Sequence, residues 1–145
     1  MSIKVSIVPV TAYQQNCSLL KCEQSGRGAI VDPGGDRDRI LAAVRALHMT
    51  PEKIILTHGH MDHCAAAGEL REELGLPIEG PERGDDFWIG KLPEWCKLAG
   101  FPPADAFEPD RWLADGDRVT VGEQLLEVLH CPGHTPGHVV LFHRG

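Results

Sequence analysis

The 145-residue sequence has no long uncharged hydrophobic run, so we expect no helix in it to cross a bilayer. The segment from Met1 to Val5 also lacks the apolar core and small-residue cleavage site of a signal peptide. Internal repeats and low-complexity segments are missing too, which argues against repeat architectures and disordered chains. These absences predict a cytoplasmic protein without a membrane partner.

Basic residues are scarce. Lys and Arg total 14 against 21 Asp and Glu, which gives a formal net charge of −7, and no basic cluster interrupts this balance. Such a surface repels the phosphate backbone of DNA or RNA, so we expect no nucleic-acid partner. The five cysteines are odd in number and widely spaced, which indicates reduced thiols rather than a disulfide framework.

The length and the 42% hydrophobic content fit one domain over residues 1–145, with a core of its own. Apolar patterns predict two helices, one beginning after Asp36 and one over 64–74, and short helices and loop over 80–109. Strands are predicted at 3–8, 17–22, 28–31, 53–56, 76–78, 118–121, 125–129 and 139–142. This mixture predicts an α/β fold in which helices cover sheets.

The sequence His58-Gly59-His60-Met61-Asp62-His63 follows the predicted strand at 53–56. Neutral imidazoles and carboxylates are the usual ligands of zinc and of non-haem iron. On an extended loop, His58 and His60 point the same way and can bind one ion. Asp62 and His63 lie one step further and can reach a second ion about 3.5–4 Å away.

A catalytic zinc ion needs three protein ligands and an open position. His134 is the best third ligand, because prolines and glycines on both sides make its loop stiff. His138 is expected to have a structural role or to orient the site. The cofactor prediction is therefore one or two zinc ions, with iron or manganese as alternatives.

Several neighbours of these segments have less specific predictions. Cys64 and Cys131 are expected to pack as small apolar groups rather than to bind metal. Asp32 has two interpretations, a turn residue or a contact to the metal-binding loop. The aromatic residues Trp88, Trp95 and Phe101 are predicted to lie in the core or in the wall of a pocket.

Two motifs carry a family resemblance, namely the 57–63 segment and the segment from His130 to His138 (HCPGHTPGH). Together they resemble the metallo-β-lactamase superfamily and, more narrowly, the single-domain bacterial type II glyoxalases, which are hydroxyacylglutathione hydrolases. The stretches at 7–12, 15–19, 31–35 and 109–113 support the narrower resemblance. The resemblance covers nearly the whole chain.

The resemblance implies an αββα sandwich with the metals at one edge, between the two sheets. It places His58, His60 and His134 on the first metal, and Asp62 and His63 on the second. It also implies a bridging aspartate and a further histidine beyond the last predicted strand, and this sequence contains neither. We therefore expect that the C-terminal portion of the fold is missing from this chain.

The function that the resemblance implies is hydrolysis of a glutathione thioester such as S-D-lactoylglutathione, by attack of metal-bound hydroxide. Asp62 is then the catalytic residue that orients this hydroxide, besides holding the second ion. Two alternatives stay open: an iron-dependent persulfide dioxygenase, and a non-catalytic metal-binding domain in which the second site is incomplete. A β-lactamase shares the motif, but the absence of a signal peptide argues against a periplasmic enzyme.

Overall fold

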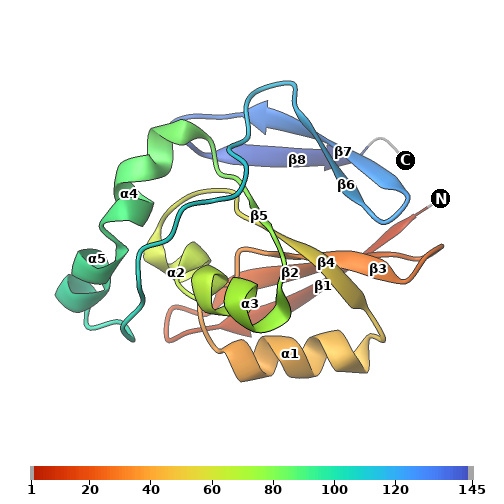
Figure 1. The fold of residues 1–145 in the computed structure, drawn as a ribbon, viewed down its shortest axis with the longest axis horizontal. Coiled ribbons are helices and arrows are strands. Elements are labelled where there is room, and N and C mark those ends of the chain that lie inside the picture. The colour runs from red at the N-terminus through yellow and green to blue at the C-terminus, as the bar shows by residue number, and fades with distance from the viewer. Residues whose placement is uncertain (1, 144–145) are drawn as a thin grey trace.

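The computed structural model describes residues 2–143, which form two β-sheets and a set of helices (Figure 1). The larger sheet has the strand order β1-β2-β3-β4-β5, and the smaller has the order β6-β7-β8. The larger sheet comprises β1 (Ile3–Val10), β2 (Gln15–Cys22), β3 (Arg27–Val31), β4 (Thr50–Ile55) and β5 (Ile78–Glu79). The smaller comprises β6 (Arg118–Val121), β7 (Gln124–His130) and β8 (Val139–His143).

The pairing is antiparallel from β1 to β3 and parallel from β3 to β5, whereas the smaller sheet is antiparallel throughout. Helical segments fill the connections between strands. They are α1 (Arg37–Ala46), α2 (Met61–Cys64), α3 (Ala67–Leu74), the 3₁₀ turn η1 (Arg83–Asp85), α4 (Asp86–Gly90) and α5 (Leu92–Ala99). Helices α1 to α3 lie on the side of the larger sheet that faces away from the smaller one (Figure 1).

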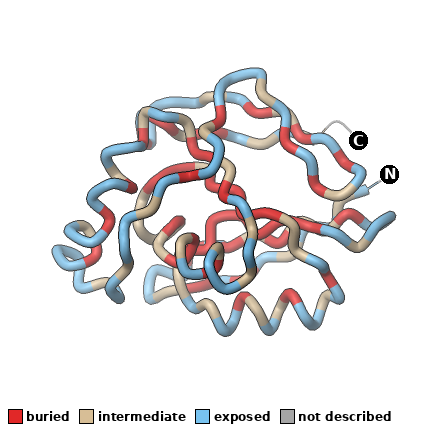
Figure 2. Tube along the Cα trace, viewed as in Figure 1, coloured by how far each residue is buried: buried red, intermediate tan, exposed pale blue. Residues whose placement is uncertain are grey.

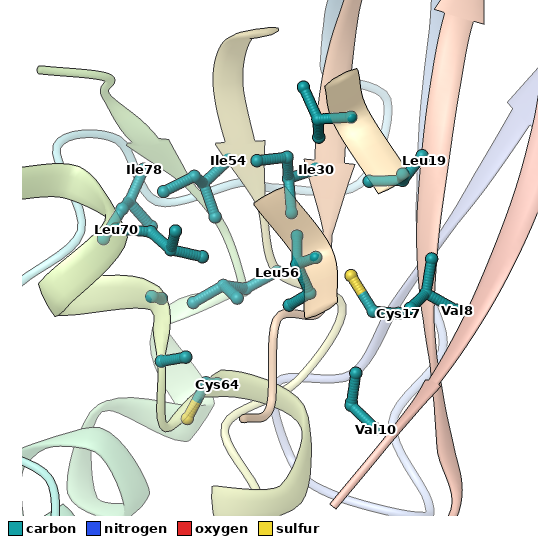
Figure 3. Close-up of a cluster of buried hydrophobic side chains, with 14 of the residues drawn as sticks. Val8, Val10, Cys17, Leu19, Ile30, Ile54, Leu56, Cys64, Leu70 and Ile78 are labelled. Atoms are coloured by element: carbon teal, nitrogen blue, oxygen red, sulfur yellow. The ribbon is translucent and has the colours of Figure 1, made fainter. Parts of the chain in front are cut away.

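Side chains alternate between two cores because successive residues of a strand point to opposite faces. Ile54 of β4 and Leu56 just after it join Ile30 in the cluster beneath the helices, which Figure 3 shows in close-up. Ile55 and Val31 point the other way, into the cluster between the two sheets. The central strands are therefore buried on both faces, as the red segments in Figure 2 show.

The predicted α/β sandwich is confirmed, and helices α1 to α3 cover the outer face of the larger sheet (Figure 1). No helix among residues 2–143 is both long and apolar enough to cross a membrane. The predicted helix over 64–74 needs a correction. Within this range only Cys64, the last residue of α2, and the whole of α3 are α-helical. The break lies between them, where the backbone N–H of Ala66 donates to the carbonyl of Pro33 (3.0 Å).

Candidate metal centre

Two loops from different sheets meet at one edge of the sandwich. The first follows β4 and continues into α2, and the second connects β7 to β8. The backbone N–H of Val139, where β8 begins, donates to the carbonyl of Thr57 at 2.8 Å, which joins the loops directly. Close packing also fixes α2, because a Cβ atom on Gly34 would lie 1.7 Å from the Asp62 carbonyl oxygen. The two sequence motifs are thus brought together by main-chain contacts.

Three of the predicted ligands converge. Side-chain nitrogens of His58, His60 and His134 all lie within 4.8 Å of one another. The imidazole of His58 is buried, that of His60 is half-buried and that of His134 is exposed. Three nitrogens from two loops, open on the His134 side, match the requirement for three protein ligands and an accessible fourth position.

His58 is held in one tautomer by its neighbours. The Thr57 hydroxyl lies 2.6 Å from Asp32 Oδ2 and 3.0 Å from His58 Nδ1. A carboxylate only accepts, so the hydroxyl donates its proton to Asp32 and accepts from Nδ1–H of His58. The lone pair of His58 is then on Nε2, a buried atom with no hydrogen-bond partner in the described structure. A buried imidazole nitrogen without a partner fits a metal ligand, because a bound ion would satisfy it.

His63 and Asp62 form a second group beside the first. Nδ1 of His63 lies 3.0 Å from Asp32 Oδ2, and its Nε2 lies 3.8 Å from Asp62 Oδ2. Asp32, His58 and His63 also bring ligand atoms within 4.8 Å of one another. Since Asp32 already accepts from Thr57 and His63, its carboxylate orients both histidines. Of its two interpretations, the structure therefore supports the contact to the metal-binding loop.

Burial sets the charge state of the imidazoles. It lowers the pKa of His58 to about 2, aided by repulsion from His63 and His138. Burial also lowers the pKa of His60 and of His138, and in both cases the nearby His134 adds to the effect. Neutral imidazoles are the form that binds metal ions, so these residues keep their lone pairs at physiological pH.

His63 differs from the other histidines. Burial disfavours its charged form, but the hydrogen bond to Asp32 and the charges of Asp32 and Asp62 outweigh burial and raise its pKa. The two carboxylates therefore concentrate negative charge on the His63 side of the centre. A cation placed there would compete with the proton of His63.

The residues near the predicted ligands have mixed outcomes. Cys64 is buried, its Sγ donates to the Gly59 carbonyl (3.4 Å), and burial raises its pKa, so it packs as a neutral thiol as predicted. The same prediction for Cys131 is wrong, because that residue is exposed on the β7–β8 loop. His138 lies beside His58, with ring centroids 4.6 Å apart, but outside both ligand groups.

Two contributors to the site were missed in the sequence. Asp85 is fully buried and accepts from Gly59 N, Gly137 N and the Thr135 hydroxyl. It belongs to the mixed segment 80–109, where no period or motif distinguishes it. Thr57 was quoted only as part of a motif, although its hydroxyl orients His58.

The aromatic prediction is confirmed in part. The Trp88 ring stands edge-on to His60, with centroids 4.8 Å apart and planes at 90°, so it walls the centre. Trp95 packs against Trp88 at 4.8 Å. Phe101 agrees with the prediction, because it packs against the core and lines a cavity of about 420 Å³, together with Tyr13 of the β1–β2 loop and the Gly34–Gly35 turn.

The family model described as the metallo-beta-lactamase superfamily matches residues 10–145. The chain belongs to the metallo-β-lactamase superfamily. The sandwich with a histidine-rich edge is therefore the fold of this superfamily, as the motifs predicted. A divalent-metal centre built from these histidine and aspartate groups agrees with that membership.

Relatives within the superfamily differ in what their names state. The chain is 41% identical over 138 residues to hydroxyacylglutathione hydrolase GloC of Haemophilus influenzae, covering 94% of this chain and 65% of that protein. A structure of TTHA1623 in a di-iron-bound form matches with a TM-score of 0.84 at 30% identity, covering 96% of this chain and 67% of that one. A structure of the B3 metallo-β-lactamase BLEG-1 matches with a TM-score of 0.84 at 28% identity, covering 97% and 68%. The chain thus spans about two thirds of the length of these proteins.

Proposed function

We propose that the centre is a divalent-metal site that hydrolyses a glutathione thioester such as S-D-lactoylglutathione. The observation that carries the metal part is the convergence of His58, His60 and His134 from two loops, with a buried and unpartnered Nε2 on His58. The thioester part is supported by the 41% identity to a protein named hydroxyacylglutathione hydrolase. A β-lactamase with the same fold is a more distant match at 28% identity.

In this proposal His58, His60 and His134 hold the first ion, and Asp62 and His63 hold the second. Zinc suits this mixture of imidazole and carboxylate ligands, and the di-iron form of TTHA1623 supports iron as the main alternative. Bound ions would lower the pKa of water toward about 7, so that it can attack a carbonyl at neutral pH.

The chain's own residues prepare this reaction. The Asp32–Thr57 pair keeps the proton of His58 on Nδ1, which leaves Nε2 free to bind. The Asp62 carboxylate lies 3.8 Å from His63 Nε2 and would accept a hydrogen bond from the attacking water, which would orient it. The leaving thiol has an ordinary pKa of about 8.5, so it departs as thiolate without a strong general acid.

The test measures metal content and the release of free thiol from S-D-lactoylglutathione by the same preparation. We expect metal-dependent release that a chelator abolishes and added zinc or iron restores. Asp62→Ala should remove it, whereas Asp38→Ala, at an exposed ion pair on α1, should retain it. Full turnover by Asp62→Ala would refute the assignment of Asp62.

Two other outcomes identify the alternatives. Iron-dependent oxygen uptake with glutathione persulfide, without thioester hydrolysis, would identify a persulfide dioxygenase, and the iron in the TTHA1623 structure is what favours this candidate. About one bound ion per chain with neither activity would identify a non-catalytic metal-binding domain.

A further inference from the structure

Asp85 is a buried carboxylate placed between the two loops of the metal centre. It ends η1, and its residue exposure is 0%. Its Oδ2 accepts from Gly59 N at 2.8 Å and from the Thr135 hydroxyl at 2.7 Å, and its Oδ1 accepts from Gly137 N at 2.7 Å. Burying a carboxylate is costly unless donors satisfy it, and these three donors do so.

The positions of the donors give the carboxylate its significance. Gly59 lies between His58 and His60 in the first loop, and Thr135 directly follows His134 in the second. Asp85 therefore binds residues that are direct sequence neighbours of His58, His60 and His134, the three histidines whose nitrogens converge. None of these hydrogen bonds uses a histidine nitrogen, since two donors are backbone amides and the third is a hydroxyl.

The packing around Asp85 leaves little freedom for either loop. A Cβ atom on Gly137 would lie 2.4 Å from the Glu82 carbonyl oxygen and 2.6 Å from the Asp85 amide nitrogen. In addition, the Glu82 amide donates to the Gly137 carbonyl at 3.1 Å. The second loop thus lies directly against η1, and the carboxylate joins this contact to the first loop.

We propose that Asp85 is a positioning residue that fixes the distance between the two metal-binding loops, so that His58, His60 and His134 are arranged before an ion binds. The inference rests on the metal centre of the proposed function, but not on the thioester substrate. Asp85 belongs to neither group of converging ligand atoms, and its oxygens accept hydrogen bonds from the two loops, so its role in the proposal is to position the ligands. Its effect on metal affinity is transmitted through the loops that it holds, by way of the Gly59 and Gly137 amides and the Thr135 hydroxyl.

The first experiment titrates the purified metal-free chain with zinc against a competing chelator, and with cobalt by its visible absorption. Asp85→Asn preserves shape but replaces one of the two acceptor oxygens by an NH2 donor, so at least one of the three hydrogen bonds is lost. We expect zinc affinity to fall about 10–100-fold, as typically follows the loss of a group that orients ligands. The cobalt absorption should change as well, because the ligand geometry changes. Asp86→Asn, at the exposed neighbouring position, is the matched control and should bind zinc within twofold of the original chain.

Thr135→Val removes one of the three hydrogen bonds and keeps the carboxylate, so we expect zinc affinity to fall about tenfold. This variant carries the affinity test if Asp85→Asn does not fold. Amide hydrogen exchange of the metal-free chain gives a readout that needs no ion. Exchange at Gly59 and Gly137 should accelerate in the Asp85 or Thr135 variant, while the amides of β1 and β2 stay protected.

The outcomes separate the two proposals. A folded Asp85→Asn chain, or else Thr135→Val, with zinc affinity and cobalt absorption equal to those of the original chain overturns the positioning role. An original chain that binds neither zinc nor cobalt overturns the proposed metal centre instead. If the original chain binds neither metal, amide hydrogen exchange decides the positioning role. Exchange at Gly59 and Gly137 that is the same in the Asp85 or Thr135 variant as in the original chain overturns it, and exchange that accelerates at these two amides but not in β1 and β2 supports it.

Discussion

Thr57→Val tests whether the tautomer of His58 is set by its neighbours. The substitution keeps the side-chain shape but removes the hydroxyl that donates to Asp32 at 2.6 Å and accepts from His58 Nδ1 at 3.0 Å. The Asp32 contacts to Thr57 N at 2.8 Å and to His63 Nδ1 at 3.0 Å do not need the hydroxyl. The variant therefore isolates the link between Asp32 and His58.

The magnitude follows from the burial of His58, which is only 3% exposed. Without the hydroxyl, Nδ1–H of His58 loses its acceptor, and Asp32 loses one donor. Leaving a buried donor unsatisfied costs about 1–3 kcal/mol of stability. The proton is then free to move to Nε2, so we expect zinc affinity to fall about 10–100-fold, or about 1.4–2.8 kcal/mol.

The assay is competitive zinc titration, with denaturant unfolding of the metal-free chain measured in parallel. Thr57→Ser restores the hydroxyl and should restore the affinity. Thr120→Val is the control, because it removes a hydroxyl that accepts from Lys53 Nζ at 3.3 Å, away from both metal-binding loops. A Thr57→Val chain that binds zinc as tightly as Thr120→Val would show that the hydroxyl does not set the tautomer.

Two further predictions concern the histidines. His134→Ala removes one of the three converging nitrogens and should lower zinc affinity by more than about 100-fold in a chelator titration. His48→Asn is the control and should leave zinc affinity unchanged; His48 is exposed, its φ is 54°, and Asn tolerates this left-handed backbone conformation. In the metal-free chain, burial keeps the pKa of His58 near 2, whereas unfolding returns it to about 6.5. The unfolded chain then binds the extra proton, so stability should fall with pH below about 6.5, by up to about 1.4 kcal/mol per unit from this residue. His63 acts in the opposite direction: its raised pKa contributes stability at pH below about 6.5 that is lost at higher pH. The acid loss is therefore assigned to His58, and unfolding curves of His58→Asn between pH 7 and 4 should show a shallower loss of stability with acid.

Much of the fold could be predicted because its strands carry a period of two or are buried on both faces. The apolar stretch in β4 was readable without any long-range information. The alternation at the start of β1 predicted a strand there but not its buried face, because Val5 and Ile7 are exposed while Val8 and Val10 are buried. The helix predicted over 64–74 was wrong at its start, because the break at Ala66 depends on the Pro33 carbonyl, which lies far away in the sequence. Ala and Leu favour helix on either side, so local propensity does not reveal such a break.

The candidate ligands were also readable, since three histidines and an aspartate within six residues form an uncommon local pattern. Pairing His134 with that pattern used the stiffness of its loop and the strand ends, and the structure brings it within 4.8 Å of His58 and His60. Their roles as metal ligands stay a prediction until the zinc titrations are done. The exposure of Cys131 was not predicted, because the local sequence around a cysteine beside a histidine does not indicate whether its loop faces the core or the solvent.

The supporting carboxylates mark where prediction from a single sequence stops. Asp32 and Asp85 lie outside both motifs, and each acts on residues 25 to 52 positions away through hydrogen bonds. Asp32 precedes a Pro-Gly-Gly turn and Asp85 lies between Gly84 and Asp86, and both settings are typical of turns. For Asp32 a contact to the metal-binding loop was one of two interpretations, whereas nothing local separates Asp85 from a solvated aspartate. The requirement appears only in three dimensions, where imidazole protons and loop amides need an acceptor that water cannot supply. The ligand motif therefore predicts which atoms can bind an ion, and the buried carboxylates determine whether those atoms point at one position.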